Sequence, residues 1–293
     1  MMRNRAVLIT IICSLGLSFW HQPRAVGQAP GGHRTVVVQS GPLQLRAWLW
    51  RPKGQGPFPA VLFNHGSGHG VRAPSGDHDE HTMEWQAAKI APVFVRHGYV
   101  FLWLFRRGTG PSGEQGTNSS DRWDKELAVN GEEARNRLQL ELLETVELAD
   151  AQAGLVFLRS LPEVDHNRVA VVGHSFGGSL TMLMAEREDN VRAAVVFSGS
   201  ARTWPRSPEL RQRLLSAATR TSVPIFFIFA ANDYSIAPGE ALDQEMARLG
   251  KQHRLKIYPR VGRTAQEGHG FIHLRIAEWE PDVFSFLESY MRP

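Results

Sequence analysis

The 293-residue sequence predicts an α/β domain with a mostly parallel central sheet of about eight strands, helices on both faces and a small helical insert. Short apolar runs alternate along the chain with segments whose apolar residues recur at helical spacing. The runs are continuous rather than alternating in polarity, which is typical of strands covered on both faces. We therefore expect one domain over residues 30–293, with ligands at the carboxyl ends of its strands.

The predicted strands are rich in β-branched and aromatic residues and end at glycine, proline or polar residues. The first two flank a Gly-Pro turn and predict an antiparallel hairpin. The expected strand segments are 33–41, 43–52, 58–68, 99–113, 168–173, 191–199, 223–233 and 253–259.

The segments between the strands predict helices. Gly98 is expected to end the first, with Pro92 as a candidate kink, and Pro281 is expected near the first turn of the last. A polar helical insert is expected at about 201–221, and the charged residues 113–137 predict a long loop or a loose helical excursion over one edge. The other expected helices are 82–97, 140–161, 179–187, 238–250 and 280–291.

Residues 1–29 predict an export signal. Two arginines precede an apolar stretch of the length of a signal core, and small residues offer cleavage near Gly27 or Ala29. The stretch is short for a membrane span, so an uncleaved anchor is the lesser alternative. We expect an exported protein, in the periplasm or the medium, with no stable membrane association after cleavage.

The composition excludes several classes of protein. An apolar content of 42% and a charged content of 21% are typical of globular chains rather than disordered or fibrous ones. The net charge is +4, but lysine and arginine are scattered, so no nucleic-acid partner is expected. The single cysteine, Cys13, lies in the signal segment behind bulky Ile12, which argues against a lipidated cysteine. The mature chain would then have no disulfide, cysteine zinc site or thiol nucleophile.

The segment "VAVVGHSFGG" (169–178) is a buried strand that ends in G-x-S-x-G. This pattern is typical of a serine on a tight turn between a strand and a helix, where it acts as a nucleophile. Because the segment both follows a strand and opens a helix, Ser175 is the predicted nucleophile; a serine that only caps the helix is the alternative.

A serine nucleophile needs an imidazole base and a carboxylate that orients it. Asp233 ends the strand "VPIFFIFAAND" and is the predicted acid, although an aspartate there also suits a simple turn. His269 lies between two glycines after the last strand and is the predicted base, with His273 as its rival. The order serine, aspartate, histidine is the one expected when the nucleophile lies on such a turn.

Two backbone N–H groups must bind the oxyanion that forms on the attacked carbonyl. Phe176, directly after the nucleophile, and Ser67, in "FNHGSG", are the predicted donors. Trp204, in the insert, is the predicted substrate-binding residue, and specificity is expected from the insert and from the loops after Ser67 and Gly108. His65 and His174 are expected to pack and hydrogen bond near these loops rather than to catalyse.

The chain resembles the α/β-hydrolase superfamily, and in particular the serine esterases among the relatives of dienelactone hydrolase. The resemblance covers residues 34–293 through "NHGSG", "FRRGTGPSG", "GHSFGG", "AANDYSIAP" and "GHGF". It implies the α/β-hydrolase fold, with Ser175, Asp233 and His269 as nucleophile, acid and base. Dienelactone hydrolase itself has a cysteine at the position of Ser175, so the resemblance does not imply a lactone substrate.

Other motifs are weaker. Residues 65–81 concentrate histidines and carboxylates that suit a metal, but their spacing is that of a solvated loop, and no metal is expected. "NSS" at 118–120 matches a glycosylation acceptor, a frequent chance match. The glycine-rich loops lack the lysine of a phosphate loop and the spacing of a dinucleotide site, so no cofactor is expected.

The sequence thus predicts a serine hydrolase that cleaves small carboxylic esters through an acyl-enzyme. A peptidase of the prolyl oligopeptidase type is one alternative, although such enzymes carry a large additional domain. A catalytically silent binding protein on a hydrolase fold is the alternative from another class.

Overall fold

The computed structural model describes residues 26–28, 32–68 and 82–292. The predicted signal core, Cys13 and most of the histidine-rich segment lie outside these residues. Within the described part of the chain, no helix is both long enough and apolar enough to cross a membrane.

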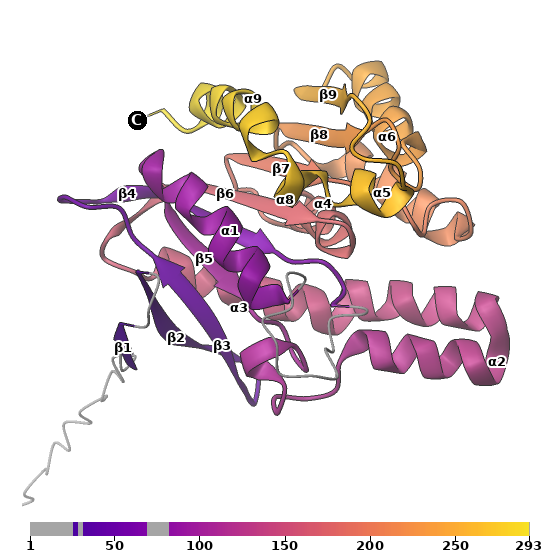
Figure 1. The fold of residues 1–293 in the computed structure, drawn as a ribbon, viewed down its shortest axis with the longest axis horizontal. Coiled ribbons are helices and arrows are strands. Elements are labelled where there is room, and N and C mark those ends of the chain that lie inside the picture. The colour runs from indigo at the N-terminus through magenta and orange to yellow at the C-terminus, as the bar shows by residue number, and fades with distance from the viewer. Residues whose placement is uncertain (1–25, 29–31, 69–81, 293) are drawn as a thin grey trace, which may run out of the picture.

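A nine-stranded sheet forms the centre of the described residues, in the order β1-β2-β3-β5-β4-β6-β7-β8-β9 (Figure 1). The strands are β1 Val26–Gln28, β2 His33–Ser40, β3 Leu43–Trp50, β4 Phe58–Asn64, β5 Val100–Leu104, β6 Val164–His174, β7 Ala193–Phe197, β8 Ile225–Ala230 and β9 His253–Tyr258. The six strands from β5 to β9 in this order run parallel, and β1, β2 and β3 add an antiparallel edge. The prediction of a mostly parallel sheet is confirmed, and the short β1 is the strand beyond the eight expected.

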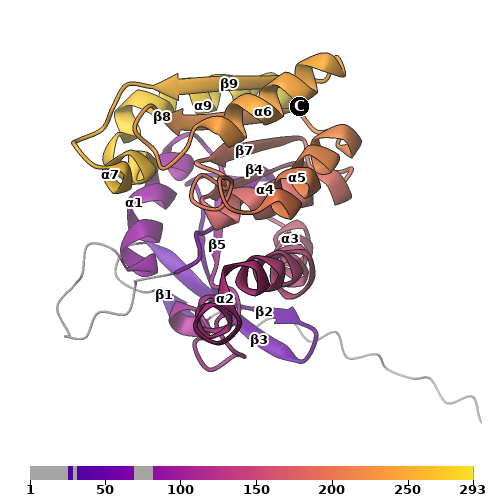
Figure 2. The ribbon, with the colours of Figure 1, turned by 90° about the vertical axis from the view of Figure 1, so that its right-hand side faces the viewer.

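Helices cover both faces of the sheet. They are α1 Met83–Arg96, α2 Ser119–Leu142, α3 Leu148–Arg159, α4 Phe176–Arg187, α5 Pro208–Arg220, α6 Ala237–Arg248, α7 Ala265–His269, α8 Phe271–Leu274 and α9 Ile276–Tyr290, with a 3-10 turn at Gly110–Ser112 and a π-helical turn at Leu143–Glu147. Figure 2 shows α1 on one side of the sheet and α3, α4 and α5 on the other.

Alternate residues of the central strands β4 to β8 pack into two separate cores. In β4, Ala60 and Leu62 belong to the core under α3 and α4, whereas Val61 and Phe63 belong to the core under α1 and α9. This is the two-residue period of a strand covered on both faces, and each fully buried Leu, Val or Phe contributes roughly 1.5–3 kcal/mol. The continuous apolar runs of the sequence follow from this double burial.

The parallel strands place their carboxyl ends at one edge of the sheet. The segments that follow β4, β6 and β8 there carry Ser67, Ser175 and Asp233, and α7, which follows β9, ends at His269. Residues more than 200 positions apart in the sequence therefore meet at this edge.

One open sequence prediction is decided and one is corrected. Of the two alternatives for residues 113–137, the structure has the helical excursion and not the long loop, because α2 starts at Ser119, where the Asn118 side chain accepts a hydrogen bond from Ser120 N at 2.7 Å. Helix α9 begins at Ile276 rather than near residue 280, so Pro281 lies inside it and not in its first turn.

Helix α2 folds back on itself at Gly131 and projects beyond the sheet as a helical hairpin (Figure 1). The backbone of Gly131 has φ 83° and ψ −176°, a conformation that is essentially restricted to glycine. The reversal therefore depends on this residue.

Replacing Gly131 by alanine should lower the free energy of unfolding by about 1–3 kcal/mol, because alanine is strained in this conformation. The cost is conformational, since a Cβ at this position meets nothing within 4 Å. Urea unfolding followed by circular dichroism measures it. Asn130→Ala, one residue earlier in the exposed hairpin, is the control and should change stability by less than about 0.5 kcal/mol. A loss in Gly131→Ala no larger than in this control would contradict the assignment.

Candidate active site

Ser175 lies on a sharp reversal between β6 and α4. Its backbone has φ 56° and ψ −118°, an unusual conformation for a residue with a side chain. The glycines of the motif permit close backbone approaches: a Cβ on Gly173 would lie 2.2 Å from the carbonyl oxygen of Gly177, and a Cβ on Gly177 would lie 2.0 Å from that of Asn64. The G-x-S-x-G pattern is thus required by packing as well as by the turn.

The structure brings the three predicted catalytic residues into one hydrogen-bonded chain. Ser175 Oγ lies 2.8 Å from His269 Nε2, and His269 Nδ1 lies 2.7 Å from Asp233 Oδ1. The Asp233 oxygen also accepts from Tyr234 N at 2.7 Å, which holds the carboxylate in place. The side chain of Asp233 is fully buried, and its Oδ2 has no hydrogen-bond partner among the described residues. This arrangement can transfer the proton of Ser175 to a correctly oriented imidazole.

His273, the alternative candidate for the base, packs against other rings. Its ring packs against His174, with ring centroids 5.5 Å apart, and against Trp85, at 6.0 Å. It is His269 that hydrogen bonds Ser175 Oγ, so the geometry favours His269 as the base.

His174 hydrogen bonds the backbone of His269. Its Nε2 lies 2.8 Å from the carbonyl oxygen of His269, so this nitrogen carries the proton and donates it. Burial, followed by the neighbouring His269, lowers the pKa of His174 to about 3. The imidazole is therefore neutral near pH 7 and holds the His269 backbone through a neutral hydrogen bond.

The predicted oxyanion donors lie beside Ser175. Phe176 is the first residue of α4, and the N–H of a first helical residue has no acceptor within its helix. Ser67 lines the same pockets as Ser175, and its carbonyl accepts a hydrogen bond from Ser120 Oγ at 2.7 Å. A Cβ on the preceding Gly66 would lie 3.7 Å from that of Ser175, so this loop reaches Ser175.

A buried ion pair hydrogen bonds the backbone of the loop at residues 65–67. The guanidinium of Arg106 pairs with Glu147 and donates from Nη2 to the carbonyl oxygens of His65 at 3.0 Å and Gly66 at 3.1 Å. The His65 ring donates from Nδ1 to Gly66 O and accepts from Arg106 N. Burial and the Arg106 charge hold the pKa of His65 well below its usual range. His65 thus packs and hydrogen bonds in this loop, as expected.

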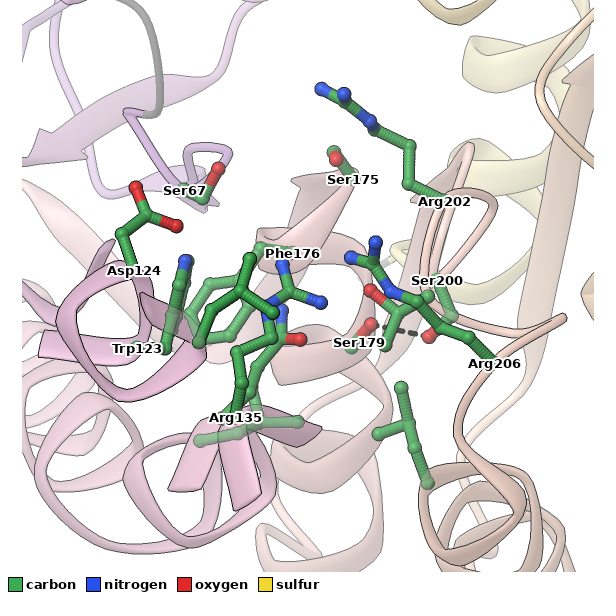
Figure 3. A pocket seen from close by; sticks show the side chains of 15 residues that line it. Ser67, Trp123, Asp124, Arg135, Ser175, Phe176, Ser179, Ser200, Arg202 and Arg206 are labelled. Atoms are coloured by element: carbon green, nitrogen blue, oxygen red, sulfur yellow. Dashed lines mark hydrogen bonds between the residues drawn. The ribbon is translucent and has the colours of Figure 1, made fainter. Parts of the chain in front are cut away.

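A cavity of about 210 Å³ opens next to Ser175 (Figure 3). The prediction that Trp204 binds substrate is not supported by its position. The indole is 6% exposed and belongs to the core, and the same segment lines the cavity with Arg202, Thr203 and Arg206 instead. An aromatic side chain in a polar insert gains more from burial in the core than from a solvated cavity.

Several lining residues of the cavity were not predicted from the sequence. Trp123, Arg135 and Gln139 come from α2, whose residues 113–137 resemble a solvated excursion when read without a structure. The only sequence signal was the concentration of arginines after β7 and in the returning half of α2.

No group of three or more metal-ligating side chains occurs in the part of the chain that the structure describes. Of the histidine-rich segment only His65 falls within that part, and it is engaged with Gly66 and Arg106.

The model of the dienelactone hydrolase family matches residues 45–277. The chain belongs to this family. The solved dienelactone hydrolase of Anabaena variabilis is similar to it, with a TM-score of 0.60, 20% identity, and coverage of 93% of this chain and 100% of that one. The Pyrococcus horikoshii acylaminoacyl peptidase gives a TM-score of 0.61 at 19% identity over 89% of this chain and 42% of that chain. These likenesses show the α/β-hydrolase fold that the sequence predicted.

Among curated proteins, a peroxisomal succinyl-coenzyme A thioesterase of Mus musculus is 26% identical over 187 residues, which are 64% of this chain and 34% of the thioesterase. The chain spans less than half the length of this and another curated relative that it matches. The family match makes the chain dienelactone hydrolase-like, and its curated relatives include this thioesterase.

The depressed pKa of His174 should make stability depend on pH. When unfolded, the imidazole takes up a proton near its ordinary pKa of 6.5, whereas in the fold it stays neutral down to about pH 3. Between these two pKa values the unfolded state binds more protons than the folded state. Lowering the pH therefore lowers the free energy of unfolding, by up to about 1.4 kcal/mol per pH unit. Between pH 6.5 and 5 we expect the wild type to lose about 1.6 kcal/mol more than His174→Gln, whose amide can still donate.

Urea unfolding at both pH values measures this difference. His166→Gln, at an exposed histidine, is the matched control and should follow the wild type. Equal losses in wild type and His174→Gln would show that His174 is not held neutral by the fold.

Proposed function

We propose that this protein is an exported serine hydrolase that cleaves carboxylic esters by acyl transfer, with Ser175 as nucleophile, His269 as base and Asp233 as its orienting acid. The observation that carries the proposal is the hydrogen-bonded chain from Asp233 Oδ1 through both ring nitrogens of His269 to Ser175 Oγ, with distances of 2.7 and 2.8 Å.

In this mechanism Ser175 Oγ attacks the ester carbonyl while its proton moves to His269 Nε2. The Nδ1–H of His269 remains hydrogen bonded to Asp233, which stabilises the imidazolium. The N–H groups of Phe176 and Ser67 bind the oxyanion, each contributing about 3–4 kcal/mol to the stabilisation of the transition state. The tetrahedral intermediate collapses as His269 returns the proton to the departing oxygen.

Deacylation repeats these steps with water. His269 takes a proton from water as its oxygen attacks the acyl-enzyme, and the collapse of the second intermediate returns that proton to Ser175 Oγ. The acid is released, and the serine hydroxyl is regenerated.

Thioester hydrolysis is a second candidate, favoured by the similarity to a coenzyme A thioesterase. The same groups would act, and a thiolate is the easier leaving group. Peptidase activity is the remaining alternative within this chemistry, since the fold is shared with an acylaminoacyl peptidase.

Replacing Ser175 by alanine should lower the hydrolysis of p-nitrophenyl esters by at least about 10⁴-fold, and Asp233→Asn by about 10³- to 10⁴-fold, because the amide favours the wrong tautomer of His269. Initial rates on acyl chains of increasing length measure both losses. Ser289→Ala, at an exposed serine on α9, is the control and should keep the wild-type rate. Mass spectrometry after treatment with a fluorophosphonate should find the adduct on Ser175.

Thioesters and anilides with the same acyl groups complete the panel. Faster turnover of anilides than of esters would replace the esterase proposal by the peptidase alternative. Absence of turnover on all three substrate classes, together with an unlabelled Ser175, would favour a silent binding protein.

Export is supported by the sequence of residues 1–29 alone. Expressed in a Gram-negative bacterium, the full chain should be found in the periplasm or medium with a new N-terminus near residue 27 or 29. A chain that lacks the first 25 residues should stay in the cytoplasm. Intact full-length chain in the membrane fraction would indicate the uncleaved anchor.

A further inference from the structure

Three guanidinium groups surround the cavity next to Ser175. Arg135 comes from the returning half of α2, and Arg202 and Arg206 come from the loop between β7 and α5. Figure 3 shows the guanidinium groups of Arg135 and Arg206 facing the same space, with Arg202 reaching toward Ser175. Two elements far apart in the sequence thus place their positive charges on one cavity.

The wall of this cavity contains buried polar atoms that lack protein partners. Arg135 is 8% exposed, and its Nε has no hydrogen-bond partner among the described residues; its Nη1 donates to Asn136 Oδ1 at 3.2 Å. Gln139 Oε1 and Trp123 Nε1 are likewise buried without a partner in the described part of the chain. Of these atoms Arg135 Nε and Trp123 Nε1 are donors, and Gln139 Oε1 is an acceptor. An unpaired buried donor costs about 1–3 kcal/mol, which a ligand that accepts hydrogen bonds would offset.

Positive side chains outnumber negative ones in the wall of this cavity. Asp124 lines the cavity, and Glu132 lies 3.9 Å from Arg206 on the exposed side of the hairpin, so in the described part of the chain two carboxylates oppose three guanidinium groups. Burial, and then the charges of Arg206 and Arg202, lower the pKa of Arg135. One bound negative charge would balance this excess, which fits a monoanionic carboxylate better than a dianionic phosphate.

The position of His269 decides which part of the substrate enters this cavity. A second, smaller cavity of about 120 Å³ also adjoins Ser175, and His269, Gln266 and Met83 line it. His269 must hand its proton to the leaving group, so the leaving group belongs on that side. The acyl group then extends into the arginine-lined cavity, which His269 does not line.

We propose that the arginine-lined cavity binds an acyl group that ends in a carboxylate, so that monoesters or monothioesters of dicarboxylic acids are the preferred substrates. Arg135 and Arg206 would donate to the carboxylate, and Arg202 would lie at the boundary between the acyl and leaving-group sides. The proposal rests on the function proposed above.

The test compares two esters of equal length that differ in one charge: p-nitrophenyl hydrogen adipate and its methyl-capped neutral analogue, both followed by release of p-nitrophenol. We expect kcat/KM to be about 10- to 100-fold higher for the anionic ester, the value of a hydrogen bond to a charged group. Glutarate and suberate esters, each with its capped analogue, measure the reach of the cavity.

The arginine variants test the residues. Arg135→Gln, Arg202→Gln and Arg206→Gln should each lower the ratio of anionic to neutral kcat/KM, the buried Arg135 most, by about tenfold or more. Arg137→Gln is the matched control, because Arg137 lies on the same helix with its side chain 63% exposed and should leave the ratio unchanged. Arg202 is exposed, so its variant should fold even where Arg135→Gln does not.

Binding provides a readout that does not need turnover. Calorimetry with free adipate and Ser175→Ala should detect binding, and adding Arg135→Gln or Arg202→Gln should weaken it. A ratio near one in a wild type whose esterase activity depends on Ser175 would overturn the inference and leave the esterase proposal intact. Adipate binding that depends on the arginines in a protein without esterase activity would overturn the esterase proposal and keep the carboxylate site.

Discussion

The reversal of the chain at Ser175 is the constraint on which the rest of the site depends. A residue with a side chain is held there at φ 56°, and it stays there because β6 and α4 are packed on both sides of it. The helix starts so close to β4 that Gly177 lies against the carbonyl groups of Asn64 and His65. The same contact that sets the turn therefore also brings the loop with Ser67 to Ser175.

Support for this loop comes from charge rather than from apolar packing. Arg106 and Glu147 are almost fully buried, which is costly for two ions unless their hydrogen bonds are made. Arg106 donates from Nη2 to the carbonyl groups of His65 and Gly66, which fixes the orientation of both carbonyls. The backbone before Ser67 is thus oriented by a group at the neighbouring strand end, so the fold itself positions the loop that carries this predicted oxyanion donor.

Sequence patterns were sufficient for the sheet and for the residues of the hydrogen-bonded chain. Buried parallel strands require continuous apolar runs, and a serine on a tight turn requires glycines around it, so both leave a local signature. The hairpin of α2 leaves none, because it projects from the sheet and buries few apolar side chains. Its existence depends on Asn118, which caps it, and on Gly131, which reverses it, in a segment whose polarity otherwise suggests a loop.

Which side chains line a cavity is harder still to predict, because the direction of a side chain depends on the tertiary structure around it. Trp204 and Arg206 are two residues apart in one polar insert, yet the indole packs in the core and the guanidinium lines the cavity. Composition suggested the opposite, since an aromatic side chain is the usual contact for a small apolar ligand. The position of Arg135 could not be inferred either, because it requires knowing that the hairpin returns across the carboxyl end of β6.

The two parts of the site are built in different ways. The groups of the hydrogen-bonded chain follow directly from strand ends, where each is held by backbone hydrogen bonds and close packing. The arginines come from α2 and from the loop after β7, which contribute little to the sheet, and in α2 the buried donors Arg135 Nε and Trp123 Nε1 have no partner among the described residues. Such donors cost stability in the free protein, and a ligand that accepts hydrogen bonds there would offset this cost. The groups that would recognise a substrate can therefore differ between relatives while the strand ends, and the chemistry that they support, stay the same.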